Sequence, residues 1–234
     1  MEIKGAKILL SGGSLGIGKA TAKALVDKGA TVVITGRNKE RIEKAAAEIG
    51  AIPCVFDISK LEEIPAGAAA CLELLGGEID VLINNAGIGE FPLLEDVEQA
   101  HFEKVFNTNV FGLALLTQEI IRPMKAKKAG TIINLGSTAS LKGFARGTVY
   151  AASKFAVRAM TQTWQAELRK ENIRVCLVNP SEVTTAFNNK EREEKASVDN
   201  KLDPDDIAHT MIAVIEMKNK GFIPEVTVWA TNPF

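Results

Sequence analysis

The pentapeptide Tyr150-Ala151-Ala152-Ser153-Lys154 holds the two side chains best suited to proton transfer, and Tyr150 is the only tyrosine of the chain. Residues four apart share one face of a helix, so the Lys154 ammonium is expected beside the phenol. An ammonium favours phenolate and lowers the phenol pKa from about 10 toward neutral pH, as a general acid or base requires. The same spacing occurs on ordinary helices, so the pair alone leaves a structural role open.

Other polar side chains follow predicted strands. Ser137, thirteen residues before Tyr150, comes after the apolar run 131–135. Asn84 ends the run 81–84, and Asn85 follows it directly. Asn109 lies early in the next helical segment. The carboxyl ends of parallel strands meet at one edge of a sheet, where ligands bind. The pattern therefore predicts one polar site at that edge.

A glycine-rich turn, Ser11-Gly12-Gly13-Ser14-Leu15-Gly16-Ile17-Gly18, separates the first strand from the first helix. Such glycines let the backbone approach a pyrophosphate, whose charge then faces the free N–H groups of the helix. The spacing is GxxxGxG rather than GxGxxG, and a glycine turn is also compatible with a plain tight turn. Its place in the first β-α unit favours phosphate binding.

The end of the second strand bears on the kind of dinucleotide. A free ribose 2′-hydroxyl usually meets an acidic residue there, but this chain has Thr35-Gly36-Arg37-Asn38. A guanidinium holds a 2′-phosphate through paired, charge-assisted hydrogen bonds. Arg37 is also compatible with a surface role, but the missing carboxylate favours NADP(H) over NAD(H).

Short apolar runs that alternate with amphipathic segments must position these residues. The runs lack in/out alternation, as expected of parallel strands with helices on both faces. We therefore predict a single α/β domain, residues 1–234, with a doubly wound parallel sheet of about seven strands. The candidate strands are 7–11, 31–35, 52–56, 81–84, 131–135, 175–179 and 226–229.

Bulk composition narrows the function class. The chain has 234 residues, is 46% hydrophobic and carries a formal net charge of -1, which gives no reason to expect nucleic acid or a membrane as partner. Cys54, Cys71 and Cys176 lack metal or redox spacing, so no metal is expected, and we interpret Cys54 and Cys176 as buried hydrophobes. With no signal-peptide pattern at the start, a cytoplasmic location is expected.

The stretch 188–201 is strongly charged and follows a strand end. It is compatible with a solvated helical face and with a substrate lid over about 186–201, and the two interpretations are not exclusive.

Taken together, these motifs resemble the short-chain dehydrogenase/reductase family over nearly the whole chain, and among its members the soluble 3-oxoacyl-thioester (acyl-carrier-protein) reductases. The resemblance implies a Rossmann-type fold. It also implies that the family's catalytic residues fall on Asn109, Ser137, Tyr150 and Lys154. Cofactor contacts are implied for Gly12, Ser14, Gly16, Ile17, Gly18, Arg37, Asp57, Asn85, Ala86, Gly87, Tyr150, Lys154, Pro180, Val183 and Thr185.

The family mechanism assigns a role to each catalytic position. Hydride reaches a carbonyl carbon while Tyr150 protonates the oxygen and Ser137 stabilises it. Lys154 holds ribose hydroxyls and Asn109 anchors a water. The reaction implied is the interconversion of a small-molecule carbonyl and a secondary alcohol with NADP(H).

The chain also departs from the family pattern. Ser181 and Ser140 replace glycines, and a serine at position 181 restricts φ beside the expected nicotinamide site. Leu15 stands where NADP(H)-binding relatives have a basic residue. The C-terminus lacks the usual Asp-Gly-Gly, so a homodimer is a safer expectation than a homotetramer. Phe144, Arg146, Thr148 and Phe187 flank the site and are candidates for shaping the pocket.

Two alternatives stay open. The substrate of such an enzyme can instead be a sugar, a polyol or another alcohol. Alternatively, the protein can be a non-catalytic NADP(H) sensor, although the four intact catalytic positions argue against this.

Overall fold

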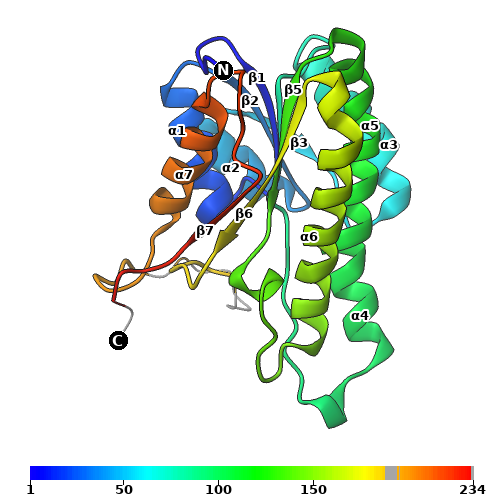
Figure 1. The fold of residues 1–234 in the computed structure, drawn as a ribbon, viewed down its shortest axis with the longest axis vertical. Helices are drawn as coiled ribbons and strands as arrows, with labels where there is room; N and C mark the ends of the chain where they lie inside the picture. The colour runs from blue at the N-terminus through cyan, green and yellow to red at the C-terminus, as the bar shows by residue number, and fades with distance from the viewer. Residues whose placement is uncertain (188–193, 195, 233–234) are drawn as a thin grey trace.

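In the computed structural model, which describes residues 1–187, 194 and 196–232, a parallel sheet runs through the middle of the molecule (Figure 1). Seven strands of the described chain pair in the order β3-β2-β1-β4-β5-β6-β7, all in parallel. They are β1 (Lys7–Ser11), β2 (Thr31–Gly36), β3 (Ile52–Val55), β4 (Val81–Asn84), β5 (Gly130–Leu135), β6 (Ile173–Pro180) and β7 (Glu225–Val228). The predicted doubly wound sheet is confirmed.

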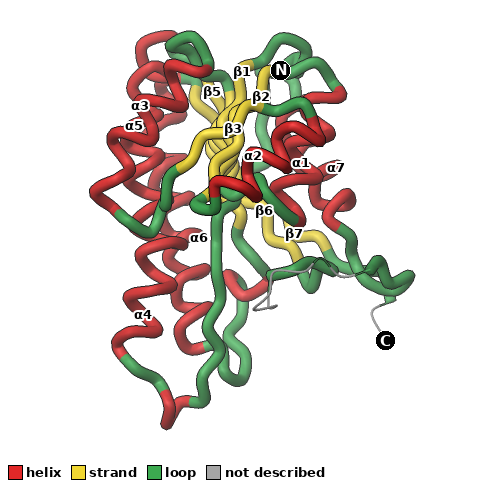
Figure 2. The backbone as a smooth tube through the Cα atoms, turned by 180° about the vertical axis from the view of Figure 1, so that it is seen from behind, coloured by secondary structure: helices red, strands yellow, loops and turns green. Residues whose placement is uncertain are grey.

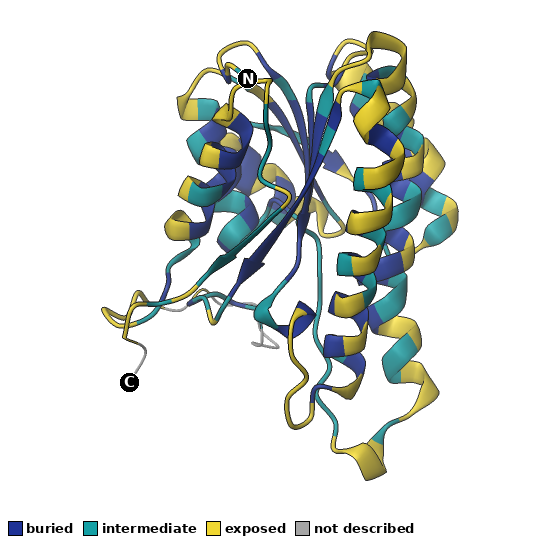
Figure 3. Cartoon of the chain, in the orientation of Figure 1, coloured by how far each residue is buried: buried dark blue, intermediate teal, exposed yellow. Residues whose placement is uncertain are grey.

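The central strands are buried because both of their faces are apolar. In β1, Ile8, Leu9 and Leu10 are all 0% exposed. Ile8 and Leu10 belong to one core cluster and Leu9 to another, on the opposite side of the sheet. Figure 3 shows the sheet as the most deeply buried layer. Burying a side chain of this size stabilises the fold by roughly 1.5–3 kcal/mol, so the apolar runs seen in the sequence build the core.

Helices cover both faces of the sheet (Figures 1 and 2). One core cluster packs α1, α2 and α7 against the sheet, and the other packs α3, α5 and the end of α6. Their bounds are α1 (Gly16–Asp27), α2 (Lys39–Ile49), α3 (Ile64–Leu74), α4 (Gln99–Phe106), α5 (Leu113–Lys127), α6 (Thr148–Leu168) and α7 (Pro204–Glu216). No helix of the described residues is long and apolar enough to span a bilayer.

The strand order reverses between β1 and β4, so the connections after these two strands diverge and leave a crevice at their carboxyl ends. Two short helical segments lie near it. A π-helix, Asn107–Gly112, joins α4 to α5, and a 3₁₀ turn, Thr138–Ser140, follows β5. Of the predicted lid, residues 188–193 and 195 lie outside the described part of the chain.

Candidate active site

The glycine turn after β1 is shaped by close backbone approach. Gly12 and Gly16 have φ angles of 74° and 52°, a region that favours glycine. A Cβ on Gly18 would lie 2.1 Å from the Gly12 carbonyl oxygen, and one on Gly12 would lie 2.8 Å from Ala86 Cα. Each of the three glycines therefore has its own conformational or steric reason to be there.

Asn85 locks this turn to the end of β4. Its Nδ2 donates to the carbonyl oxygens of Ser11 and Gly12, at 3.1 and 2.8 Å. The Ser11 hydroxyl in turn accepts from the backbone N–H groups of Asn85 and Ala86, both at 3.2 Å. Two of the predicted cofactor positions thus build the floor of the crevice between β1 and β4.

The N-terminus of α1 presents free donors to this crevice. Leu15, which precedes the helix, gives no side-chain cap, and the first turn holds no acidic residue. The Gly16 N–H instead donates to Glu194 Oε1 at 3.0 Å. A carboxylate from 178 residues away thus takes the place that suits a phosphate oxygen, which shows that this helix end attracts an anion.

Because this carboxylate competes with a phosphate for the same donor, Glu194→Gln should tighten NADP(H) binding about threefold. Isothermal titration of the cofactor into the two proteins checks this, with Glu95→Gln on an exposed 3₁₀ turn as the matched control. Weaker binding in the Glu194 variant would contradict the competition.

Arg37 and Asp57 lie together at the ends of β2 and β3. The Arg37 guanidinium is 3.9 Å from an Asp57 carboxylate oxygen, and its side chain is 62% exposed. An ion pair that is this exposed to solvent holds the guanidinium only weakly. The cation at the end of β2 is therefore available to an anionic ligand.

Ser137 is oriented by a buried polar network at the ends of β5 and β6. Its backbone N–H donates to Ser140 Oγ at 3.1 Å and to Asn179 Oδ1 at 3.2 Å, and its hydroxyl accepts from the Ala139 N–H. Asn179 Nδ2 donates to Glu225 on β7. Ser140, which departs from the family's glycine, thus helps to position Ser137.

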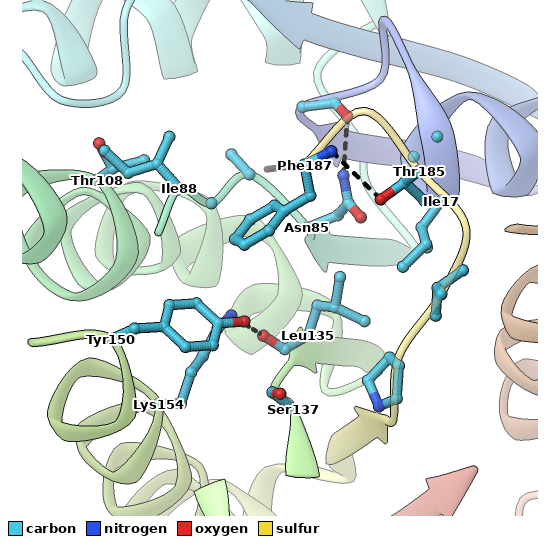
Figure 4. Close-up of a pocket in the computed structure, with 18 of the residues that line it drawn as sticks. Ile17, Asn85, Ile88, Thr108, Leu135, Ser137, Tyr150, Lys154, Thr185 and Phe187 are labelled. Atoms are coloured by element: carbon cyan, nitrogen blue, oxygen red, sulfur yellow. Dashed lines mark hydrogen bonds between the residues drawn. The ribbon is translucent and has the colours of Figure 1, made fainter. Parts of the chain in front are cut away.

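Tyr150 and Lys154 lie on the face of α6 that points at Ser137 (Figure 4). The Ser137 side chain faces the Tyr150 phenol and acts to lower its pKa. Lys154 Nζ donates to the Leu135 carbonyl oxygen at 2.7 Å and lies 5.8 Å from the centre of the Tyr150 ring. Burial lowers the pKa of Lys154 to about 8. The Tyr150 phenol, the Ser137 hydroxyl and the Lys154 ammonium therefore lie in the same part of the structure, as proton delivery to a carbonyl oxygen requires.

The prediction that Lys154 lowers the pKa of Tyr150 is wrong. Burial raises the pKa of Tyr150 to about 12, and only the Ser137 side chain acts in the lowering direction. The Lys154 ammonium points at a main-chain carbonyl, so its charge does not offset the loss of solvent around the phenol. The phenol is then fully protonated at neutral pH, the form that a general acid needs.

Since Tyr150 is the only tyrosine, the tyrosinate absorption band of the protein reports this residue alone. Folded protein should show almost no tyrosinate at pH 10, whereas chain unfolded in urea should be half ionised at about that pH. The raised pKa favours the folded state below pH 10, and this contribution is lost as pH rises toward 12. Equal titration curves in the two states would contradict the burial effect.

Asn109 lies near this group but does not line the cavity. Within the π-helix its Oδ1 accepts from the Ile88 N–H at 2.9 Å, and its Nδ2 donates to the Ile88 carbonyl and to Ser153 Oγ. Both amide hydrogens are thus used, and only a second lone pair on Oδ1 remains for a water. In this structure Asn109 fastens the loop after β4 to α6.

A cavity of about 980 Å³ brings the predicted residues together. All fifteen predicted cofactor contacts line it, as does Ser137; Asn109 alone of the predicted site residues does not. Phe144 and Phe187 also line it, whereas Thr148 does not and Arg146 reaches the Phe91 carbonyl from outside. The predicted edge of the sheet is therefore one continuous pocket.

The segment after β6 closes one side of this pocket. A Cβ on Gly16 would lie 3.2 Å from Thr185 Cγ2, so this threonine packs on the glycine turn. Ser181 does not have a positive φ, and its N–H donates to the Val228 carbonyl. The glycine that family members carry is therefore not required for this backbone.

Sequence reasoning missed three contributors to the site. Phe91 packs against the Tyr150 ring, Asn179 orients Ser137, and Glu194 binds the glycine turn. Asn179 ends a predicted strand, as Asn84 does, so its position was a usable signal. The other two contacts join distant loops, and no local pattern marks them.

Comparison with known proteins agrees with this geometry. A family model described as short chain dehydrogenase matches residues 6–196. A 3-oxoacyl-[acyl-carrier-protein] reductase of Thermotoga maritima is 33% identical over 195 residues, which are 81% of this chain and 79% of the reductase.

Two solved structures superimpose over nearly the whole chain. An alcohol dehydrogenase of the archaeon Thermococcus sibiricus, complexed with 5-hydroxy-NADP, is 25% identical with a TM-score of 0.89 and 97% of each chain covered. A 3-ketoacyl-(acyl-carrier-protein) reductase from Brucella melitensis, complexed with NADH, is 30% identical with a TM-score of 0.88, covering 99% of this chain and 100% of that one.

Proposed function

The chain belongs to the short-chain dehydrogenase family, and from that premise we propose that it is an NADP(H)-dependent oxidoreductase that interconverts a carbonyl and a secondary alcohol. The observation that carries this proposal is the convergence of Ser137, Tyr150 and Lys154 in the cavity that the glycine turn also lines. Phosphate-binding and proton-donating groups thus face the same space. A protein that only binds a dinucleotide has no need for this second set.

The residues present fit a nicotinamide dinucleotide. The backbone of the glycine turn leaves no room for a Cβ on Gly18, and the helix end already attracts a carboxylate. We propose NADP(H) rather than NAD(H), because Arg37 stands at the end of β2 with most of its side chain exposed. One solved relative is complexed with 5-hydroxy-NADP and another with NADH, so both cofactors occur among similar proteins.

On this proposal Arg37→Ala should weaken NADPH binding about 10- to 100-fold and leave NADH binding within about threefold, because one charge-assisted phosphate contact is lost. Isothermal titration with each cofactor measures this without turnover. Arg122→Ala, on the exposed side of α5, is the matched control. A parallel loss for both cofactors would contradict recognition of the 2′-phosphate by Arg37.

When bound, NADPH would supply the hydride for the carbonyl carbon. Tyr150 then donates its phenolic proton to the developing alkoxide, and the Ser137 hydroxyl stabilises the same oxygen by a hydrogen bond. Lys154, which lines the same part of the cavity, would hold the ribose hydroxyls. Asn109 would hold a water near this group through the second lone pair of its Oδ1. Oxidation of the alcohol uses the same groups in the reverse order.

The substrate class, the cellular location and the oligomeric state are proposed from the relatives and from the composition. Reduction of a 3-oxoacyl thioester is one candidate reaction, since the reductase of Thermotoga maritima is so named. We also propose that binding and catalysis take place in one domain of residues 1–234, acting in the cytoplasm as a homodimer or homotetramer.

The deciding experiment follows NADPH absorbance with a panel of ketones and aldehydes, with Tyr150→Phe as the control. Oxidation of NADPH by the wild-type protein well above this control is the expected result. No difference between the two proteins with any carbonyl compound would overturn the enzymatic proposal and favour a sensor.

A further inference from the structure

Aromatic rings wall the part of the cavity that contains Tyr150. The ring centre of Phe91 lies 5.3 Å from that of Tyr150, and the ring of Phe187 lies 5.6 Å from it. Phe144 extends this wall, 6.2 Å from Phe91. Figure 4 shows the Phe187 ring above the Tyr150 ring. A group bound at the Tyr150 hydroxyl therefore has phenylalanine rings around it.

This aromatic wall (Phe91, Phe144 and Phe187) is held in place by a contact between two loops. Arg146, in the loop before α6, has a φ of 66°, and its Nε donates to the Phe91 carbonyl oxygen at 2.8 Å. The left-handed backbone is unfavourable for an arginine unless the surroundings stabilise it. The hydrogen bond fixes Phe91 beside Tyr150, so the wall is a built feature of the site.

Large apolar side chains also remain open to solvent at this wall. Phe144 is 49% exposed and Leu141 is 36% exposed, and both line the cavity. Exposed apolar surface that lines a pocket gains free energy when an apolar ligand covers it. The fold itself does not bury these two side chains, so a ligand is the component that would.

Most charged side chains of the described cavity lining lie away from the wall or are already paired. Arg37, Arg41 and Asp57 follow β2 and β3 at the other end. Glu182 accepts from Lys201 at 2.7 Å, and Lys154 donates to Leu135. Lys142, in an exposed loop, is the remaining cation of this lining. Apart from the exposed Lys142, the described residues around Tyr150 thus offer no built partner for a carboxylate or phosphate on the substrate.

On the basis of the proposed function, we propose that the substrate is an uncharged, apolar ketone that carries a flat ring close to its carbonyl. The rings of the wall are tilted by 42° to 60° to their neighbours, an arrangement that suits offset or edge contacts with a further ring. A sugar or polyol would leave its hydroxyls without partners against these rings.

Three probes with different chemistry test this assignment. They are 2-tetralone as the apolar ring ketone, dihydroxyacetone as the polar ketone and acetoacetyl-coenzyme A as the charged thioester, each with NADPH. The kcat/KM for 2-tetralone should exceed those of the other two by about 100-fold. A kcat/KM for either of the others that equals or exceeds the value for 2-tetralone would overturn the assignment.

Variants of the wall give a second test. Phe144→Ala should raise the KM for 2-tetralone about 10-fold with little change in kcat, because it removes contact area and no reacting group. It should not raise the KM for dihydroxyacetone. Phe155→Ala, an exposed phenylalanine of α6 outside the cavity lining, is the matched control and should change neither KM. Equal KM values in the two variants would overturn the role of the wall.

A binding measurement separates this inference from the proposed function. 2-Naphthol, which resembles the tetralone but cannot be reduced, is titrated calorimetrically into wild-type protein and into both variants. Binding that weakens about 10-fold in Phe144→Ala alone supports the apolar ring site even if no carbonyl compound is turned over. Turnover of some carbonyl compound without binding of 2-naphthol would instead support the enzyme and overturn the assigned substrate class.

Discussion

Replacing Tyr150 by phenylalanine is expected to lower kcat for carbonyl reduction by about 10³-fold while the protein stays folded. The change removes only the phenolic oxygen, so the ring contacts with Phe91 and Phe187 remain. The proton for the developing alkoxide then has to come from water. Steady-state kinetics with NADPH and a carbonyl substrate measure the loss.

The loss should be confined to the chemical step. NADPH affinity, measured by calorimetry, should stay within about threefold of wild type, because the variant removes one neutral hydroxyl at most. Unfolding in urea should occur at a similar midpoint, since the change removes one hydroxyl beside the Ser137 side chain. A kcat within a factor of ten of wild type would show that another group delivers the proton.

The sequence was sufficient for the sheet and for the edge at which the candidate site lies. Apolar runs such as the one in β1 have one stable arrangement in this fold class, with helices on both faces. Because all strands are parallel, Asn85 after β4 and Ser137 after β5 had to meet at the same edge. This is why Asn85 and Ser137 were predicted from their place at strand ends, whereas most of the other cofactor contacts were implied by the family resemblance.

The pKa shift of Tyr150, the orientation of Asn109 and the contact of Glu194 depend on burial and on tertiary contacts, which residue spacing does not reveal. The i,i+4 spacing correctly put Lys154 on the same face as Tyr150, but the sign of the pKa shift depends on how deeply the phenol is buried and where the ammonium points. Asn109 turns toward Ile88 because the chain there forms a π-helix, which shifts the face of each following residue. The contact of Glu194 with Gly16 joins segments 178 residues apart.

Gly18→Ala should weaken NADPH binding by about 100-fold, which corresponds to about 2.7 kcal/mol. Its φ is not positive, so space rather than backbone conformation excludes the new methyl group. The added Cβ would lie 2.1 Å from the Gly12 carbonyl oxygen and 2.5 Å from Asn85 Nδ2. One of these atoms is main chain, so a side-chain rotation cannot relieve the clash, and the turn itself has to open.

Opening the turn has two consequences that different measurements detect. Movement of Gly12 breaks the hydrogen bond that Asn85 donates to its carbonyl oxygen, and it carries the N–H groups of the helix end away from a bound phosphate. The calorimetric Kd reports this displacement. The overpacked turn should also lower the free energy of unfolding by roughly 1–3 kcal/mol, which urea denaturation reports.

A glycine elsewhere in the chain provides the matched control. The Cβ of Gly221→Ala would lie 3.9 Å from Met217 Cε, which is an ordinary van der Waals contact. Gly221 belongs to the loop before β7 and does not line the cavity. That variant should bind NADPH and unfold like the wild type. If Gly18→Ala behaved in the same way, the tight packing of Gly18 against Gly12 would not be what shapes the phosphate site. Loss of affinity in the Gly18 variant alone, with its circular dichroism spectrum unchanged, ties cofactor binding to this one backbone contact.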